Sequence, residues 1–402
     1  METAATPVPS EQCARTLSSI APTEADAAGQ GAVMRRFTWG RGVLVVGLAG
    51  AVAGVVPSGV SALSIRVRCR ATAVVTNYGS GTVSTIDVNT KTKNRTDIPV
   101  GPVPSGVAIT PDGKTAFVTN LTGTVSTIDV KSRTKDPTDI PVGPAPVGVA
   151  ITPVGTTAFV TNFGPFTSLS EAVDAIREPT PGIVGTVSTI DVKTRTKDPT
   201  DIPVGALPLG VTVTPDGTTA FVTNLGSGTV STIDVKTKTK NPTDIPVGLY
   251  PAGVAVTPDG KTAFVTNFGP FTNLDPSTPE GIGTVSTIDV KTGTKDFTDI
   301  AVGSGAVGVA VTPDGKTAFV ANRASGTVST IDVDTKSKSL TDIPVGANPN
   351  GVAVTPDGKT AFVTDLSGRT VSTIAVKRKT KDPGNIPSGL SPLQVAVTPC
   401  RR

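Results

Sequence analysis

The sequence predicts an all-β fold, a seven-bladed β-propeller built from four-stranded antiparallel blades. The heptapeptide TVSTIDV, or a close copy, starts at seven positions that lie 42 to 62 residues apart. Each repeat holds four short stretches rich in valine and threonine, which glycine and proline turns separate. Four strand-like segments within a base period near 42 residues are typical of propeller blades.

One repeat shows the four expected strands in order. They are GVAIT (106–110), TAFVT (115–119), TVSTIDV (124–130) and TDIPVG (138–143), which we call the inner, second, third and outer strands. Proline lacks the N–H that a sheet ladder needs, so the proline-containing fourth strand is expected at the edge of its blade. The phenylalanine of each second strand is expected to fill the core between blades. These are Phe117, Phe159, Phe221, Phe264, Phe319 and Phe362.

Repeated polar residues mark the turns. Asp112 and its equivalents stand in Pro-Asp-Gly turns, and because each lies on a separate blade we expect turn formation rather than a metal ring. Asn120 and its equivalents end the second strand and are expected to shape the turn that follows. Asp129 and its equivalents close the third strand and are expected to cap the next turn.

The two ends of the repeat region complement each other. The first repeat lacks an inner strand, and the chain ends on VAVTPC, which is an inner strand without a second one. We expect 395–399 to pair with 72–77 and so close the ring. Cys69 and Cys400 both align with Asp112, which predicts a disulfide between them that replaces the missing turn. Two unpaired cysteines are the alternative.

The N-terminal part predicts export. Residues 1–33 form either a disordered extension or a mis-assigned start, residues 34–62 a signal peptide, and residues 63–402 the propeller. Arginines precede the apolar run 43–56, and small residues at 60–62 suit cleavage. An uncleaved membrane anchor and a buried helix are the alternatives. The expected location is secreted or in the cell envelope, with membrane contact only if the signal is uncleaved.

Composition excludes several kinds of site. The chain has no histidine, which removes Ser-His-Asp catalysis and histidine-bound zinc or haem. No acid–base pair, phosphate-binding loop or cysteine metal spacing is present, so we predict no catalytic residue, no metal and no cofactor. The net charge of +4 gives no polyelectrolyte argument for nucleic acid.

The repeat resembles the YVTN-repeat family of β-propellers. The stretch GVAVTPDGKTAFVTN, followed by GTVSTIDV and TDIPVG, carries the resemblance, which covers residues 71–399. It implies a seven-bladed propeller. Relatives include archaeal surface-layer proteins and periplasmic bacterial proteins, some of which bind nucleic acid. More distant propellers include haem-binding domains, quinone-cofactor dehydrogenases and sugar lactonases, so the resemblance alone leaves the function open.

Two surfaces are candidates for binding. Loops 162–185 and 267–283 follow second strands and bring Phe163, Phe166, Phe268 and Phe271 to one face, as a partner site or as a lid without ligand. Loops rich in lysine and arginine gather on the other face, as a polyanion-binding surface or as a solvated rim.

The sequence therefore favours an exported, non-enzymatic binding scaffold, expected to be a monomer with a protein or glycan ligand. The alternatives are a lactonase-like enzyme, a haem-binding cofactor carrier, and a weak binder of DNA or other polyanions through the basic face.

Overall fold

The computed structural model describes residues 38–39, 42–43, 71–164, 184–270 and 281–400. The chain divides into two units, Met1–Ile65 and Arg66–Arg402. In the first unit β1 (Thr38–Trp39) and β2 (Gly42–Val43) pair antiparallel. The predicted extension and most of the predicted signal peptide lie outside the described residues. Among the residues described, no helix is long and apolar enough to span a membrane.

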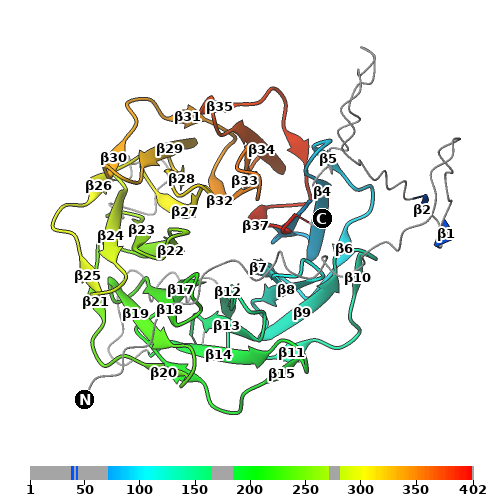
Figure 1. The fold of residues 1–402 in the computed structure, drawn as a ribbon, viewed down its shortest axis with the longest axis horizontal. Coiled ribbons are helices and arrows are strands. Elements are labelled where there is room, and N and C mark those ends of the chain that lie inside the picture. The colour runs from blue at the N-terminus through cyan, green and yellow to red at the C-terminus, as the bar shows by residue number, and fades with distance from the viewer. Residues whose placement is uncertain (1–37, 40–41, 44–70, 165–183, 271–280, 401–402) are drawn as a thin grey trace, which may run out of the picture. The chain divides into compact units, whose positions relative to one another are not determined.

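The second unit is the predicted seven-bladed propeller, and Figure 1 shows its blades around a central axis. Each blade places an inner strand nearest the axis and hydrogen-bonds it to a second strand. The inner strands are β37 (Pro392–Val397), β7 (Pro104–Ile109), β12 (Pro146–Ile151), β17 (Pro208–Val213), β22 (Pro251–Val256), β27 (Ala306–Val311) and β32 (Pro349–Val354). The second strands are β3 (Thr72–Asn77), β8 (Thr115–Asn120), β13 (Thr157–Asn162), β18 (Thr219–Asn224), β23 (Thr262–Asn267), β28 (Thr317–Asn322) and β33 (Thr360–Asp365). We number the blades 1 to 7 in this order.

The third strand of each blade carries the heptapeptide and pairs with the second strand along its whole length. These strands are β4 (Thr82–Asp87), β9 (Thr124–Asp129), β14 (Thr186–Asp191), β19 (Thr229–Asp234), β24 (Thr284–Asp289), β29 (Thr327–Asp332) and β34 (Thr370–Ala375). In blade 2, for example, Thr115 of β8 lies opposite Asp129 of β9, and Asn120 lies opposite Thr124.

The outer strand differs from the prediction because it is split into two short pieces. In blade 2 these are β10 (Thr134–Lys135) and β11 (Ile140–Pro141), which both pair with β9. The expected strand 138–143 was therefore too long, and part of residues 131–136, which belong to one of the expected lysine- and arginine-rich loops, is in the sheet. The remaining pieces are β5 (Thr92–Lys93), β6 (Ile98–Pro99), β15 (Thr196–Lys197), β16 (Ile202–Pro203), β20 (Thr239–Lys240), β21 (Ile245–Pro246), β25 (Thr294–Lys295), β26 (Ile300–Ala301), β30 (Ser337–Lys338), β31 (Ile343–Pro344), β35 (Thr380–Lys381) and β36 (Ile386–Pro387).

The core consists of apolar layers between neighbouring blades. Phe117 of blade 2, for example, packs in one cluster with Ala158, Val160 and Ile190 of blade 3. All six second-strand phenylalanines are fully buried, which confirms their predicted role. Because every layer needs both of its blades, the ring has to close before the last layer is complete.

Ring closure occurs as predicted, through β37 and β3. Val397, Ala396 and Val395 lie opposite Ala73, Val74 and Val75. The main-chain N–H of Thr398 donates to the carbonyl oxygen of Thr72 (2.9 Å), as that of Thr110 donates to Thr115 in the continuous turn of blade 2. The turn is thus reproduced across the two chain ends.

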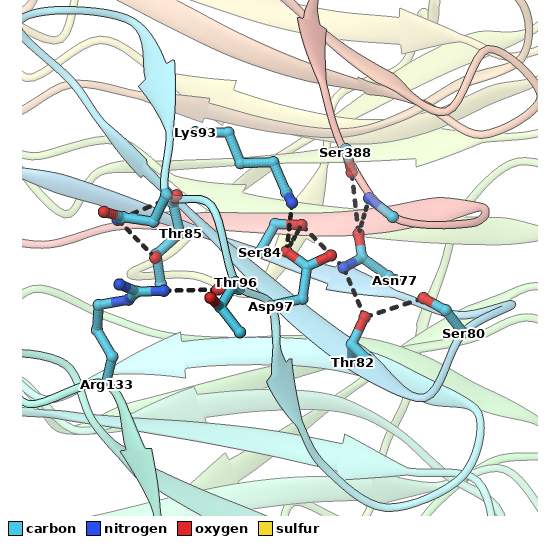
Figure 2. Close-up of polar contacts among 12 residues, drawn as sticks. Asn77, Ser80, Thr82, Ser84, Thr85, Lys93, Thr96, Asp97, Arg133 and Ser388 are labelled. Carbon is cyan, nitrogen blue, oxygen red and sulfur yellow. Dashed lines mark hydrogen bonds and ion pairs between the residues drawn. The ribbon is translucent and has the colours of Figure 1, made fainter.

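A polar network fastens each blade internally, and Figure 2 shows it in blade 1. The Asn77 amide nitrogen donates to the hydroxyls of Thr82 (3.0 Å) and Ser84 (2.9 Å). Ser84 in turn donates to a carboxylate oxygen of Asp97 (2.8 Å), which Lys93 approaches to 2.7 Å. Asn77 thus does more than shape a turn, because its buried amide joins two strands.

The repeated aspartates of the turns have the structural roles that the sequence predicts. The carboxylate of Asp112 accepts hydrogen bonds from the Thr110 hydroxyl (2.6 Å) and the Lys114 main chain (3.0 Å). These bonds, the one from Thr110 above all, lower the pKa of Asp112 to about 2. Asp129 accepts from the main chain and the hydroxyl of Ser132 and so caps the turn after β9.

Candidate functional site

The propeller axis holds a cavity of about 960 Å³, which we call the funnel. Its wall is formed by the inner strands, and its mouth by the loops after the second strands together with the links that lead into the inner strands. Glycines of the inner strands line it, and Gly106 shows why: a Cβ there would lie 2.3 Å from the Val147 carbonyl oxygen of the next blade. The volume and the mostly apolar lining suit a small-molecule site.

A ring of seven residues, one from each blade, surrounds the mouth. Each directly follows the last residue of a second strand, and its main-chain N–H donates to a carbonyl oxygen of the neighbouring link at 2.8–3.1 Å. Six of the seven acceptor residues are not glycine and still have positive φ angles, of 49–55°. The seven, which we call the mouth ring, are Tyr78, Leu121, Phe163, Leu225, Phe268, Arg323 and Leu366.

Blades 3 to 5 give the funnel an apolar wall. Phe163 and Leu225 of the mouth ring are buried and pack with Leu207 in one cluster. Leu209 and Ala252 continue this wall along the inner strands. No charged residue of these blades is among the described residues that line the funnel.

Polar side chains concentrate in the other blades. Arg323, from the end of β28 in blade 6, is the one charged residue among the described residues of the lining. Asn350 of β32, Gln394 of β37 and Ser105 of β7 follow on three successive inner strands, which lie side by side in Figure 1. Partial burial raises the pKa of the Tyr78 phenol, so this group stays protonated and able to donate a hydrogen bond.

The junction of blades 6 and 7 lacks a contact that the other junctions have. At the second-last position of the second strand, six blades carry a threonine whose hydroxyl donates to an inner-strand carbonyl of the next blade, as Thr119 does to Val147 (2.7 Å). Blade 6 has Ala321 instead. This departure lies two residues from Arg323, beside Asn350 of the next blade.

In blade 7 a carboxylate replaces the buried amide of the polar network. Asp365 stands where the other six blades have asparagine, and Asn385 stands where they have aspartate. Asp365 is 0% exposed, and its oxygens accept from the Gly346 main chain (3.1 Å), Thr370 (3.0 Å) and Ser372 (2.8 Å). Burial raises its pKa although these bonds oppose the shift.

On the opposite face, acids pair with many of the basic side chains that the sequence places there. Arg195 pairs with Asp136 of the preceding blade, and Lys91 with Asp382 (2.6 Å) across the seam. Within blades, the lysine of the first outer-strand piece pairs with an aspartate four residues later, as Lys93 does with Asp97. These pairs neutralise part of the predicted basic surface and favour its interpretation as a solvated rim.

The structure brings together two of the four predicted site residues. Phe163 and Phe268 both belong to the mouth ring, whereas Phe166 and Phe271 lie outside the described residues. Sequence reasoning missed Arg323, Asn350 and Gln394. The signal that could have found them is their departure from the repeat, because six of the seven inner strands carry glycine where Gln394 stands.

A family model described as lactonase, seven-bladed β-propeller, matches residues 70–394. The chain belongs to this family. The prediction of a non-enzymatic binding scaffold is therefore wrong, and the lactonase-like alternative takes its place. The error came from treating the missing histidine and carboxylate cluster as evidence against any enzyme. No curated protein matches the chain.

Solved structures share the fold of this lactonase-family propeller. Hydrazine synthase of Kuenenia stuttgartiensis is 22% identical with a TM-score of 0.63, over 76% of this chain and 92% of that one. A Bacteroides fragilis protein described as a candidate 6-phosphogluconolactonase is 18% identical with a TM-score of 0.64, over 82% of this chain and 98% of that one. A dihydro-haem d1 dehydrogenase is 13% identical with a TM-score of 0.53, over 81% of this chain and 74% of that one. At these identities the likeness concerns the fold alone.

Proposed function

We propose that this protein hydrolyses a lactone in the axial funnel. The observation that carries the proposal is the lactonase family match over residues 70–394. The funnel supports it with one cation, Arg323, and hydrogen-bonding side chains opposite an apolar wall. A haem carrier is less well supported, because the haem-related structure reported above is only 13% identical to this chain.

The chemistry assigned to the funnel is attack of water or hydroxide on the lactone carbonyl carbon. The ring C–O bond breaks, and the product is a hydroxy acid. Arg323 stays protonated at all relevant pH values, so its guanidinium can stabilise the developing oxyanion and then the product carboxylate. Since no carboxylate lies among the described residues of the lining, we assign the attack to hydroxide from solution rather than to a side-chain base.

The test is the initial rate of acid release from γ-decalactone, corrected for spontaneous hydrolysis. Arg323→Leu is the decisive variant, because leucine occupies the mouth ring in three other blades and suits the fold. We expect it to lose at least about 100-fold of kcat/KM, as expected when one oxyanion donor is removed. Arg369→Leu is the matched control, since Arg369 is exposed and outside the funnel lining, and it should match wild type. Equal rates for both variants would reject the site, and no turnover of γ-decalactone or of glucono-δ-lactone by wild type would reject the function.

We also propose the finer identity and location of the chain. The motif GVAVTPDGKTAFVTN places it among YVTN-repeat proteins within the family, and the segment 34–62 supports export. The alignment of Cys69 and Cys400 with the same turn position supports a disulfide between them, although Cys69 lies outside the described residues. Two free thiols in the unreduced, denatured protein would reject this pairing, and an unprocessed N-terminus on secreted protein would reject cleavage.

A further inference from the structure

The polar side chains of the funnel gather on one side of its axis, where apolar residues such as Leu121, Leu366 and Leu393 also line it, and this asymmetry breaks an otherwise regular repeat. Arg323, Asn350, Gln394 and Ser105 come from consecutive blades 6, 7, 1 and 2, whereas blades 3 to 5 contribute apolar residues. At the position of Asn350, the inner strands of blades 3 to 6 carry valine, leucine, alanine and valine. The polar side therefore results from individual substitutions and not from the blade architecture.

Two of the polar side chains on this side, Asn350 and Gln394, make no side-chain hydrogen bond to a described residue. Asn350 is 8% exposed, and its side-chain amide makes no hydrogen bond to any described residue. The same holds for the side-chain amide of Gln394, which lies over Gly351: a Cβ on that glycine would lie 2.8 Å from the Gln394 Oε1 atom. Both side chains line the funnel, so their free donors and acceptors are available to a ligand that enters it.

Apolar residues line the opposite side of the funnel, among them Phe163, Leu225 and Leu209. Phe163, Leu207 and Leu225 pack together, and Leu209 extends the cluster toward the inner strands. Such a wall favours a hydrocarbon group and gives the hydroxyls of a sugar no partner. The two sides thus select different parts of one ligand.

We infer that the funnel binds an alkyl-substituted lactone and its ring-opened hydroxy acid. The carbonyl or carboxylate end faces Arg323, Asn350 and Gln394, and the alkyl arm lies on blades 3 to 5. This inference rests on the proposed lactone hydrolysis and names its substrate class. A guanidinium is well matched to a carboxylate, and each methylene on the apolar wall is expected to tighten binding about fourfold.

The test measures binding separately from turnover. Isothermal titration calorimetry of the full chain compares 4-hydroxydecanoate, 4-hydroxybutanoate and gluconate. We expect 4-hydroxydecanoate to bind at least 100-fold more tightly than the other two. The double variant Asn350→Val/Gln394→Gly, which installs residues found at the same positions of other blades, should weaken that binding at least tenfold and keep the dependence on chain length.

Each outcome separates the inference from the proposed function. Binding of 4-hydroxydecanoate without hydrolysis of either γ-decalactone or glucono-δ-lactone keeps the inference and rejects the function. Hydrolysis of glucono-δ-lactone in preference to γ-decalactone keeps the function and rejects the inference. Wild-type affinity in the double variant, confirmed as folded by circular dichroism, rejects the roles of Asn350 and Gln394.

Discussion

Replacing Asp365 by asparagine should stabilise the protein at neutral pH. The substitution restores the amide donor of the other blades, where an asparagine donates to a threonine and a serine hydroxyl, as Asn77 does to Thr82 and Ser84. Asn385 remains the acceptor from Ser372, in place of the aspartate of the other blades. Asp365 is fully buried, and burial raises its pKa. Removing a buried charge that three hydrogen bonds only partly stabilise should raise the free energy of unfolding by about 1–3 kcal/mol.

The stability that Asp365→Asn gains over wild type must increase as the pH rises. The folded protein favours protonated Asp365, whereas an unfolded aspartate titrates near pH 3.9. Below that value both states are protonated and the carboxyl costs nothing. As the pH rises toward the folded pKa, the wild type loses stability relative to Asp365→Asn, and above the folded pKa the difference is constant.

Urea denaturation followed by circular dichroism, at several pH values from 3.5 to 8, measures this difference. The reverse substitution Asn322→Asp in blade 6 is the matched control and should destabilise the protein at neutral pH. A variant Asp365→Asn that is less stable than wild type at pH 7, or whose gain grows as the pH falls, would refute the reasoning.

Three further substitutions test the packing. Ala321→Thr should restore the bridge from blade 6 to the Asn350 carbonyl and add about 1 kcal/mol to the free energy of unfolding, and an unchanged urea midpoint would contradict this. Phe264→Ala, in a core layer between blades 5 and 6, should cost about 3–5 kcal/mol in the same assay, and a loss below 1 kcal/mol would show that the layer contributes little. Cys400→Ser should lower stability by about 4–5 kcal/mol if a disulfide closes the ring, and equal stability with and without reductant would speak against the bond.

Repetition explains why the fold could be predicted so fully. Aligning seven copies fixes strand positions that a single copy would leave ambiguous. The strand order, the buried phenylalanines and the closure of β37 on β3 all followed from this alignment. The split outer strand could not be foreseen, because Thr134–Lys135 looks like part of a polar loop until its pairing with β9 is known.

The site was harder to predict because it consists of exceptions to the repeat. Phe163 and Phe268 drew attention as aromatic residues at loop starts, and both reach the funnel mouth. Arg323 and Gln394 are unremarkable residue types, and only the ring brings them from distant repeats to one cavity. Their departure from the consensus was visible in the sequence, but its meaning depends on which repeat position faces the axis.

The pH dependence of kcat/KM for γ-decalactone hydrolysis tests the central claim most directly, because the claim assigns catalysis to Arg323 and to hydroxide in the funnel. After correction for spontaneous hydrolysis, kcat/KM should rise about tenfold per pH unit between pH 6 and 9, without a plateau. The variant Arg323→Leu should have a lower kcat/KM at every pH in this range. A plateau with an acidic limb would contradict the account, because it would show that a titrating group of the protein, and not hydroxide from solution, supplies the base.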